Sequence, residues 1–270
     1  MNKCELCGFK NPKGSVTAII IKNNSVLMLK RNEEPFKDMW DFPGGYMSDG
    51  ERPCYSLKRE MKEELGVECK TTFIKSEPGY GFWKGDKFPV LNMFFLAEIE
   101  GDIKLNEENS EYRWWPIKDI VPEDMAFDSI VNFCKWLKEN FQFDIDRVKE
   151  LTQQLDSSAV INEQSLYKAV LDGYVSKLFC DGKLVGLGWI YPRQTMLRAQ
   201  AVIEDMIVDN EHRGKKYGEK ILLELIDWAK KEGVEVIELT SGFHRKAAHG
   251  LYHKHGFIDH NTQHMLLKLQ

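Results

Sequence analysis

Three closely spaced glutamates are the residues of this 270-residue chain whose types and positions could most readily do chemistry. Glu60, Glu63 and Glu64 lie in a segment with a proline at its start and a glycine after its end, which predicts a helix over residues 53–65. Because positions three and four apart share one face of a helix, the three carboxylates should converge. Carboxylate oxygens are hard ligands that favour Mg²⁺ or Mn²⁺, and these ions also bind substrate phosphates.

The frame around these glutamates decides between two interpretations. A glutamate-rich helix face is usually only solvated. Residues 44–67, however, read G-G-x5-E-x7-R-E-U-x-E-E-x-G-U, where U is an apolar residue. This pattern resembles the signature of the Nudix hydrolases, and the resemblance covers about residues 15–140. It implies hydrolysis of a nucleoside diphosphate linked to another group, by attack of water on phosphorus.

The resemblance also implies roles for individual residues. Glu60, Glu63 and Glu64 would hold the metal ions, with the Gly44 carbonyl as a further ligand. A metal held there would neutralise the diphosphate, orient it and lower the pKa of a bound water.

The general base varies among Nudix hydrolases, so two candidates stay open here. Glu60 is the first, and Glu111, three residues before Trp114, is the second and a further candidate metal ligand. Glu51 and Arg59 resemble the pair that braces the loop against the helix.

The surrounding segments predict the elements that hold this helix. Two strands over residues 16–29 should meet at an Asn23-Asn24 turn. We also expect a buried strand over 90–99, a short strand over 112–116 and a closing helix over 128–140.

The substrate is not specified by the sequence beyond its class. Tyr80, Phe82 and Trp83 lie in a glycine-rich stretch that we interpret as a loop. Their rings could stack on a base or a sugar, or simply pack against the protein.

The second half of the chain has its own pattern of elements. Residues 178–190 predict two strands joined at Asp181-Gly182. The elements expected after this hairpin are a strand over 201–208, a helix after residue 218, a strand over 234–240, a helix over 245–255 and a last strand over 264–269.

A glycine-containing turn precedes the first of these helices. Such a turn exposes backbone N–H groups beside the positive end of the helix dipole, where phosphates bind. Alone, the R-G-x-x-x-G of residues 213–218 would more often be a plain turn. Here a strand precedes it, and L-Y-x-x-x-G-F follows at residues 251–257. The combination resembles the GNAT-type N-acetyltransferases, over about residues 147–270.

That resemblance implies a site for acetyl-CoA. Tyr252 would be the acid that protonates the leaving thiolate, and Glu204 or Asp205 would help to deprotonate an amine. The strand backbone of Met206, Ile207 and Val208 would contact the pantetheine arm. The residues around the pyrophosphate would be Arg213, Gly214, Lys215, Lys216, Tyr217 and Gly218.

Two departures from the acetyltransferase pattern leave an alternative open. Lys216 stands where a glycine is expected, and Arg245 stands where many members have an asparagine near the cofactor. Tyr252 could also be a core aromatic residue. The second half could therefore be a silent module that senses acetyl-CoA and regulates the hydrolase.

Composition sets the remaining limits. The chain is 43% hydrophobic and 29% charged, which is normal for a globular protein. No apolar run approaches the roughly 18 residues that span a membrane. A formal charge of −5 gives no attraction to nucleic acid. The N-terminus does not read as a secretory signal, so we expect a cytoplasmic protein.

Cysteines and histidines offer weaker signals. Cys4 and Cys7 resemble half of a zinc knuckle, but no second pair follows before Val16, so a vestigial ribbon or a plain turn competes with a zinc site. His249 and His253 are four apart on an expected helix, without a third ligand in sequence.

Together these patterns predict an α+β protein of two domains. Residues 1–142 would form a Nudix α/β/α sandwich with a mixed sheet, of which 1–14 are a leader. Residues 143–270 would form a GNAT fold, a central mixed sheet flanked by helices. The expected partners are a small nucleotide, acetyl-CoA and a small amine, with Mg²⁺ or Mn²⁺ as cofactor. Both domain types often dimerise, so a homodimer is a further expectation.

Overall fold

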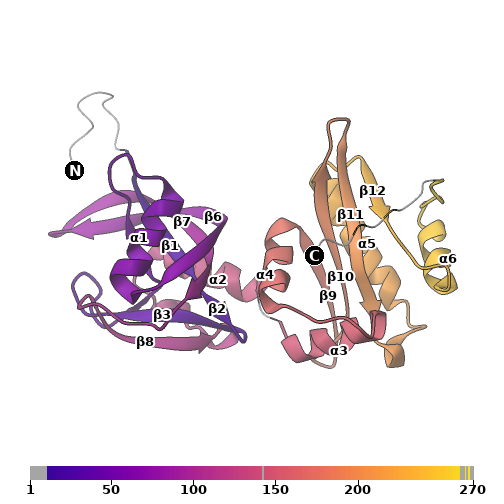
Figure 1. Cartoon of the computed structure of the whole chain (residues 1–270), viewed down its shortest axis with the longest axis horizontal. Coiled ribbons are helices and arrows are strands. Elements are labelled where there is room, and N and C mark those ends of the chain that lie inside the picture. The colour runs from indigo at the N-terminus through magenta and orange to yellow at the C-terminus, as the bar shows by residue number, and fades with distance from the viewer. Residues whose placement is uncertain (1–10, 142, 262–264, 266, 268–270) are drawn as a thin grey trace. The chain divides into compact units, whose positions relative to one another are not determined.

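The computed structural model describes residues 11–141, 143–261, 265 and 267, and the chain divides into two compact units (Figure 1). The first unit runs to Val148 and also includes Asn162–Leu171. The second comprises Lys149–Ile161 and the chain from Asp172 onward. The chain therefore alternates between the units instead of passing once from one to the other. The prediction of an α+β protein with two mixed-sheet domains is confirmed.

The first unit contains two four-stranded sheets. In the first sheet β1 pairs parallel with β7 and antiparallel with β5, and β6 pairs antiparallel with β7. Its strands are β5 (Gly44–Tyr46), β1 (Lys13–Ile19), β7 (Asp86–Glu100) and β6 (Glu68–Trp83), in that order. The second sheet is antiparallel and contains β2 (Ile21–Lys22), β3 (Ser25–Arg31), β4 (Trp40–Asp41) and β8 (Asn109–Pro116).

Helix α1 (Pro53–Leu65) forms over the predicted residues. Pro53 fits its first turn, and Gly66 ends it with a φ of 67°. Leu57, Met61 and Leu65 are fully buried on one stripe of the helix and join a core cluster with residues of β1, β3 and β7. This packing fixes which face of α1 carries the glutamates.

The remaining helices of this region differ in how far the sequence predicted them. Helix α2 (Asp128–Asn140) has the expected bounds. Helices α3 (Ile145–Leu155) and α4 (Glu163–Asp172) were not expected. The interpretation of residues 80–83 as a loop is wrong, because they belong to β6, and the β6–β7 hairpin turns at Lys84-Gly85.

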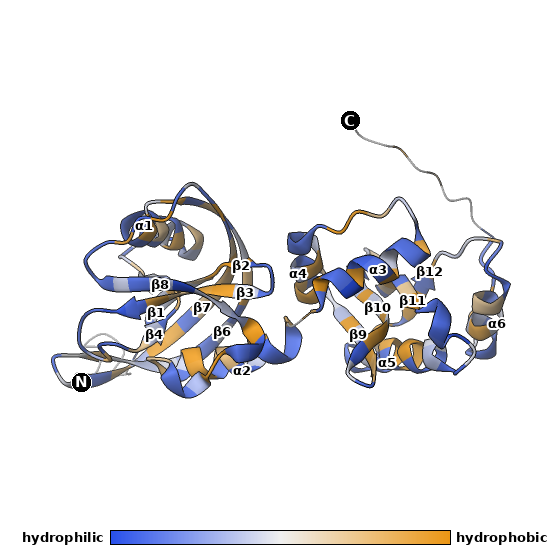
Figure 2. Ribbon diagram, turned by 90° about the horizontal axis from the view of Figure 1, so that it is seen from below, coloured by the Kyte–Doolittle hydropathy of each residue, from blue (hydrophilic) through white to orange (hydrophobic). Residues whose placement is uncertain are grey.

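The second unit is built on one mixed sheet of four strands in the order β12-β11-β10-β9. The hairpin turn at Asp181-Gly182 is confirmed, and both residues have positive φ. Helix α5 packs on β9, β10 and β11 through a buried apolar stripe, and apolar residues gather in these elements (Figure 2). The elements are β9 (Tyr174–Cys180), β10 (Lys183–Gln194), β11 (Ala199–Val208), α5 (Tyr217–Lys231), β12 (Val236–Leu239) and α6 (Lys246–Lys254).

Three predicted features lie wholly or partly outside the described residues: the pair Cys4 and Cys7, the leader over 1–14, and the last strand over 264–269. Within the described part of the chain, no helix is both long and apolar enough to cross a bilayer.

Candidate active sites

Two glycines allow β5 to lie directly against its neighbours, Gly44 against β1 and Gly45 against α1. Gly44 has a φ of 149°, and a Cβ on it would stand 2.1 Å from the Val16 carbonyl oxygen. A Cβ on Gly45 would stand 2.6 Å from the carboxyl group of Glu60. Any side chain at either position would therefore push the strand away from β1 or displace a carboxylate of α1.

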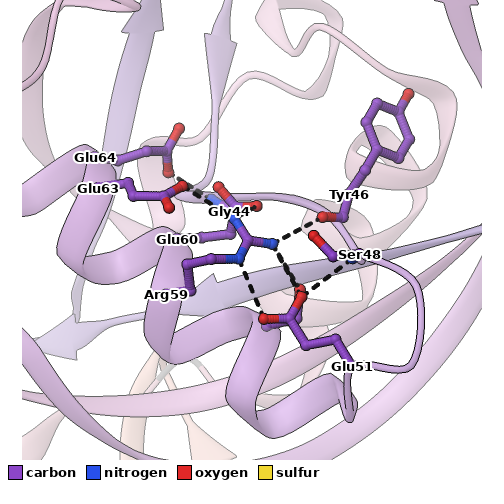
Figure 3. A network of polar contacts seen from close by, with 9 residues as sticks. Gly44, Tyr46, Ser48, Glu51, Arg59, Glu60, Glu63 and Glu64 are labelled. Carbon is purple, nitrogen blue, oxygen red and sulfur yellow. Dashed lines mark hydrogen bonds and ion pairs between the residues drawn. The ribbon is translucent and has the colours of Figure 1, made fainter.

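Arg59 is the centre of the polar network on this face of α1 (Figure 3). Its guanidinium donates to both carboxylate oxygens of Glu51, at 3.2 and 3.1 Å, and to the Tyr46 carbonyl at 3.1 Å. The Nη1 atom of Arg59 also donates to Glu60 at 2.7 Å and to Glu63 at 3.0 Å. These bonds confirm that Glu51 and Arg59 brace the loop against the helix.

The same contacts set the charge of Glu51. The hydrogen bonds from Arg59, followed by one from the Ser48 N–H, lower the pKa of Glu51 to about 2. Glu51 is therefore fully ionised and serves the loop rather than proton transfer.

Glu64 is the most buried of the three glutamates of α1, with 7% of its surface exposed. Its carboxylate accepts hydrogen bonds from the Gly44 N–H at 2.7 Å and from the Asn109 amide at 3.4 Å. Burial raises the pKa of Glu64 to about 8. Burial also raises the pKa of Glu60. The raised pKa values mean that the positive charges and hydrogen bonds of the protein do not fully stabilise the ionised forms of Glu60 and Glu64.

The chemistry of this donor set suits a divalent cation. Glu60, Glu63 and Glu64 offer hard oxygen ligands from one helix, and Glu63 is 54% exposed at its side chain, which leaves an open side. The three carboxylates do not all lie within 4.8 Å of one another, so their predicted convergence is incomplete here and a bound cation would have to draw them closer. Arg59 is the cation that pairs with Glu60 and Glu63. A cation bound among these oxygens would offset the desolvation that raises the pKa of Glu64.

The β8 region holds the other predicted acidic candidate. Glu111 forms an ion pair with Arg113 at 2.9 Å and pairs in register with Lys30, and its predicted role stays a prediction. Glu108, which sequence reasoning missed, is instead the acidic residue of this region whose charge raises the pKa of Glu60. Asn109 reaches Glu64. Residues 106–109 belong to no motif with a recognisable spacing. Their polarity was therefore the only signal in the sequence that could have indicated a role.

Aromatic rings gather near β4 and β6. The ring of Phe36 packs edge-to-face with the rings of Phe82 and Phe127, with distances between ring centroids of 5.4 Å and 5.1 Å. Tyr80 lies beneath the Lys87 ammonium, 4.0 Å from the ring centroid. Of the rings for which stacking on a substrate or packing against the protein was left open, Phe82 packs with other aromatic rings and Tyr80 packs with a lysine.

The predicted phosphate loop of the second unit, residues 213–218, leads into the first turn of α5. Gly214 has a φ of 78° and Lys216 a φ of 61°. Lys216 thus adopts the left-handed conformation that a glycine would take most easily, and the backbone accommodates the departure noted in the sequence. The Arg213 guanidinium donates to the Val208 carbonyl at 3.2 Å, which ties the loop to the end of β11.

A cavity of about 460 Å³ lies where β11 and β12 stop pairing. The pairing ends at Ile203 and Leu239, and a bulge on β11 gives Asp205 a φ of 51°. The lining residues are Leu155, Asp156, Ile203, Glu204, Asp205, Met206, Leu239, Thr240, Ser241, Gly242, Arg245 and Tyr252.

The cavity brings together several of the predicted acetyltransferase residues. Tyr252, Glu204, Asp205 and Met206 line it, whereas Ile207, Val208 and the loop over 213–218 do not. Burial raises the pKa of Tyr252, so its hydroxyl stays protonated near neutral pH. This is the protonation state that a proton donor needs.

One of the two histidines spaced four apart has a carboxylate neighbour. His253 Nε2 lies 3.1 Å from a carboxylate oxygen of Asp259. Within the described residues, the cluster with metal-ligand spacing is Asp209, Glu211 and His212. Asp209 accepts a hydrogen bond from the Glu211 N–H and so acts as a cap of that turn.

Comparison with known proteins identifies both halves. The NUDIX domain family matches residues 12–137, and the acetyltransferase (GNAT) family matches residues 131–257. The chain is 30% identical to an ADP-ribose pyrophosphatase of Methanocaldococcus jannaschii over 47% of this chain and 76% of the relative. It is 37% identical to an 8-oxo-dGTP diphosphatase of Buchnera aphidicola over 26% of this chain and 64% of the relative.

Solved structures resemble each half separately. A NUDIX hydrolase from Nitrosomonas europaea is 26% identical, covers 51% of this chain and 78% of its own, and has a TM-score of 0.41. An aminoglycoside acetyltransferase from an uncultured soil metagenomic sample is 16% identical to this chain and has a TM-score of 0.42. The match covers 47% of this chain and 88% of the acetyltransferase. The chain is an enzyme that belongs to the Nudix hydrolase family and also carries an acetyltransferase domain of the GNAT family.

Proposed function

We propose that the chain is a bifunctional enzyme. The first unit hydrolyses a nucleoside diphosphate linked to another group, with Mg²⁺ or Mn²⁺, and the second transfers an acetyl group from acetyl-CoA to a small amine. The observation that carries the first activity is the convergence of Glu60 and Glu63 on Arg59 beside the buried Glu64. Curated relatives named for ADP-ribose and 8-oxo-dGTP support a nucleotide substrate.

In this proposal Glu60, Glu63 and Glu64 hold the cation, with the Gly44 carbonyl as a further ligand and Glu111 as an outer candidate. Such a cation would neutralise the diphosphate and lower the pKa of a water molecule. Glu60 would accept the proton of the attacking water.

The protein's own contribution is to keep these groups in place. Arg59 fixes the side chains of Glu60 and Glu63, and Glu51 fixes Arg59 in turn. Because catalytic oxygens must be held within fractions of an ångström, this bracing is part of the site.

The test of the hydrolase is Glu63→Gln in the full chain, which removes one ligand charge and keeps the shape. We expect hydrolysis of nucleotide substrates to fall at least about 100-fold, while acetyl-CoA binding is unchanged. Glu68→Gln is the matched control, because Glu68 is an exposed glutamate that pairs with Lys62. Retained hydrolysis in Glu63→Gln would remove the carboxylate assignment.

For the second activity, Tyr252 and Glu204 face one cavity from different elements. The loop from Arg213 to Gly218 would take the pyrophosphate of acetyl-CoA, and the β11 backbone from Met206 to Val208 would take the pantetheine arm. Glu204 would accept the amine proton and Tyr252 would give a proton to the thiolate. Calorimetry with acetyl-CoA tests this assignment, since absence of binding would favour a silent regulatory module.

A further inference from the structure

The cavity of the second unit is lined by a guanidinium with unused hydrogen-bonding capacity. Arg245 stands at the N-cap of α6 and lines the cavity. Its Nη2 atom donates to the Leu155 carbonyl at 3.1 Å, which fixes its orientation. This is the single hydrogen bond of the Arg245 side chain within the described residues. A guanidinium carries five N–H groups, so four donors stay available.

A second donor lies in the same lining. The Oγ atom of Ser241 is buried and has no hydrogen-bond partner among the described residues. A buried hydroxyl without a partner is energetically unfavourable, and a ligand acceptor within its reach would relieve that cost. Ser241 and Arg245 both precede α6, a helix of nine residues whose positive dipole end also favours an anion. A guanidinium and a hydroxyl together match the two oxygens of a carboxylate.

A purely anionic ligand does not fit this cavity. Asp156, Glu204 and Asp205 also line it, so the lining holds three carboxylates against one guanidinium. The carboxylate of Asp156 accepts hydrogen bonds from the Ser158 N–H at 2.9 Å and from its Oγ at 2.7 Å, which hold it ionised. A ligand that satisfies the whole lining must carry both a negative and a positive group.

We propose that the acetyl acceptor is an amine that also carries a carboxylate, an amino-acid-type molecule. Its carboxylate binds Arg245 and Ser241, and its amino group faces Glu204 across the cavity. The proposal rests on the acetyl transfer proposed above and adds the acceptor's chemical class. A cavity of about 460 Å³ suits a small acceptor together with the acetyl end of the cofactor. The loop proposed for the cofactor pyrophosphate does not line this cavity, so Arg245 is not needed for that group.

The transfer balances with the residues of the cavity. The neutral amine attacks the thioester carbonyl carbon, a C–N bond forms and the C–S bond breaks. Glu204 accepts the proton that the amine loses, and Tyr252 donates a proton to the thiolate. The products are the N-acetylated acceptor and coenzyme A, with the acceptor carboxylate unchanged on Arg245.

The experiment uses the full chain and matched pairs of acceptors, each standard amino acid and its α-carboxamide. Thiol release from acetyl-CoA gives kcat/KM for every pair. We expect at least one amino acid to exceed its carboxamide by about tenfold or more, the value of a lost charge-assisted hydrogen bond. Arg245→Gln should remove that preference by lowering kcat/KM for the amino acid alone. Arg245→Lys should restore part of it, and Ser241→Ala should weaken it.

Two controls separate failure of this inference from failure of the acetyltransferase. Calorimetry with acetyl-CoA on the unsubstituted protein and on Arg245→Gln should give affinities within about threefold of each other. Arg193→Gln, which removes an arginine paired with Glu238 outside the cavity lining, should leave the preference intact. No binding of acetyl-CoA would overturn the proposed activity and this inference together.

The remaining outcomes bear on the inference alone. With acetyl-CoA bound, equal use of amino acids and carboxamides would overturn it. An equal loss for both acceptor classes in Arg245→Gln would also overturn it, because the arginine would then act on the cofactor or the fold. Absence of turnover with every amino acid would count against it in the same way.

Discussion

The Gly44 N–H donates a hydrogen bond of 2.7 Å to Glu64, so the buried carboxylate of α1 is tied to the backbone of β5. Burial nevertheless dominates and raises the pKa of Glu64 from 4.5 to about 8. An acid whose pKa is raised by folding lowers the stability of the fold as pH increases from its unfolded to its folded pKa. The free energy of unfolding should therefore fall between about pH 4.5 and 8 in metal-free protein.

Glu64→Gln should remove this penalty. We expect the variant to be more stable than the unsubstituted protein in chelator at pH 8, by roughly 4 kcal/mol, and to lose hydrolysis. Thermal unfolding with and without Mg²⁺ is the measurement. Mg²⁺ should raise the Tm of the unsubstituted protein and have little effect on the variant. A less stable variant in chelator would show that the charge of Glu64 is not the destabilising feature.

Gly45→Ala tests the close approach of β5 to α1. A Cβ at position 45 would lie 2.6 Å from the Glu60 carboxyl group, so this side chain must move. We expect kcat for nucleotide hydrolysis to fall roughly tenfold or more, since small displacements of catalytic groups are costly. The Tm should fall only slightly. Gly250→Ala is the control, because nothing lies within 4 Å of a Cβ there. Unchanged kcat in Gly45→Ala would mean that Glu60 need not hold its position.

Substitutions in α4 test whether this helix stabilises the first unit. Glu163 accepts hydrogen bonds from the Asn23 and Asn24 N–H groups, both at 3.0 Å, and Tyr167 is fully buried against Phe141. Tyr167→Ala should destabilise the first unit by about 3–5 kcal/mol, the usual cost of deleting a buried aromatic ring. Tyr55→Ala, at a 58% exposed position, is the control.

The corresponding truncations give the same test by another route. A chain ending at residue 142 would lack α4, whereas one ending at residue 172 would keep it. We expect the longer piece to have the higher Tm. Equal unfolding temperatures would show that α4 adds nothing to the first unit.

Tyr252→Phe tests the proton donor of acetyl transfer. Because burial raises the pKa of Tyr252, the hydroxyl should stay protonated through neutral pH. Removal of the hydroxyl should lower kcat by about 10²–10⁴-fold and leave the Kd of acetyl-CoA nearly unchanged. The pH–rate profile should lose its alkaline limb, which lies above the ordinary pKa of tyrosine because burial raises the pKa of Tyr252. A variant with full kcat would make Tyr252 a packing residue.

The sequence predicted those elements whose boundaries are set by local chemistry. Pro53 and Gly66 delimit α1, and Asp181-Gly182 supplies the two positive φ values of the β9–β10 turn. These residues act on their own backbone, so no distant contact was needed to interpret them.

The sequence failed where distant contacts decide the structure. Gly79 and Gly81 suggested a loop, but both lie in β6, where a Cβ would meet Ser129 at 2.9 Å and the Tyr46 hydroxyl at 2.4 Å. Close approach of other side chains therefore accounts for these glycines. The position of Glu163 depends likewise on a turn about 140 residues earlier in the chain. The charge of Glu108 raises the pKa of Glu60 only because folding brings together two residues that are far apart in the sequence.

Hydrolysis of a nucleotide panel with Mg²⁺ is the most direct test of the central claim that α1 carries a metal-dependent pyrophosphatase site. The panel would include ADP-ribose, nucleotide sugars, dinucleotides and nucleoside triphosphates, each with the unsubstituted protein and Glu63→Gln and each repeated in chelator. We predict hydrolysis of at least one nucleotide that disappears in chelator and in the variant. Hydrolysis that persists in both, or no hydrolysis of any nucleotide, would contradict the claim.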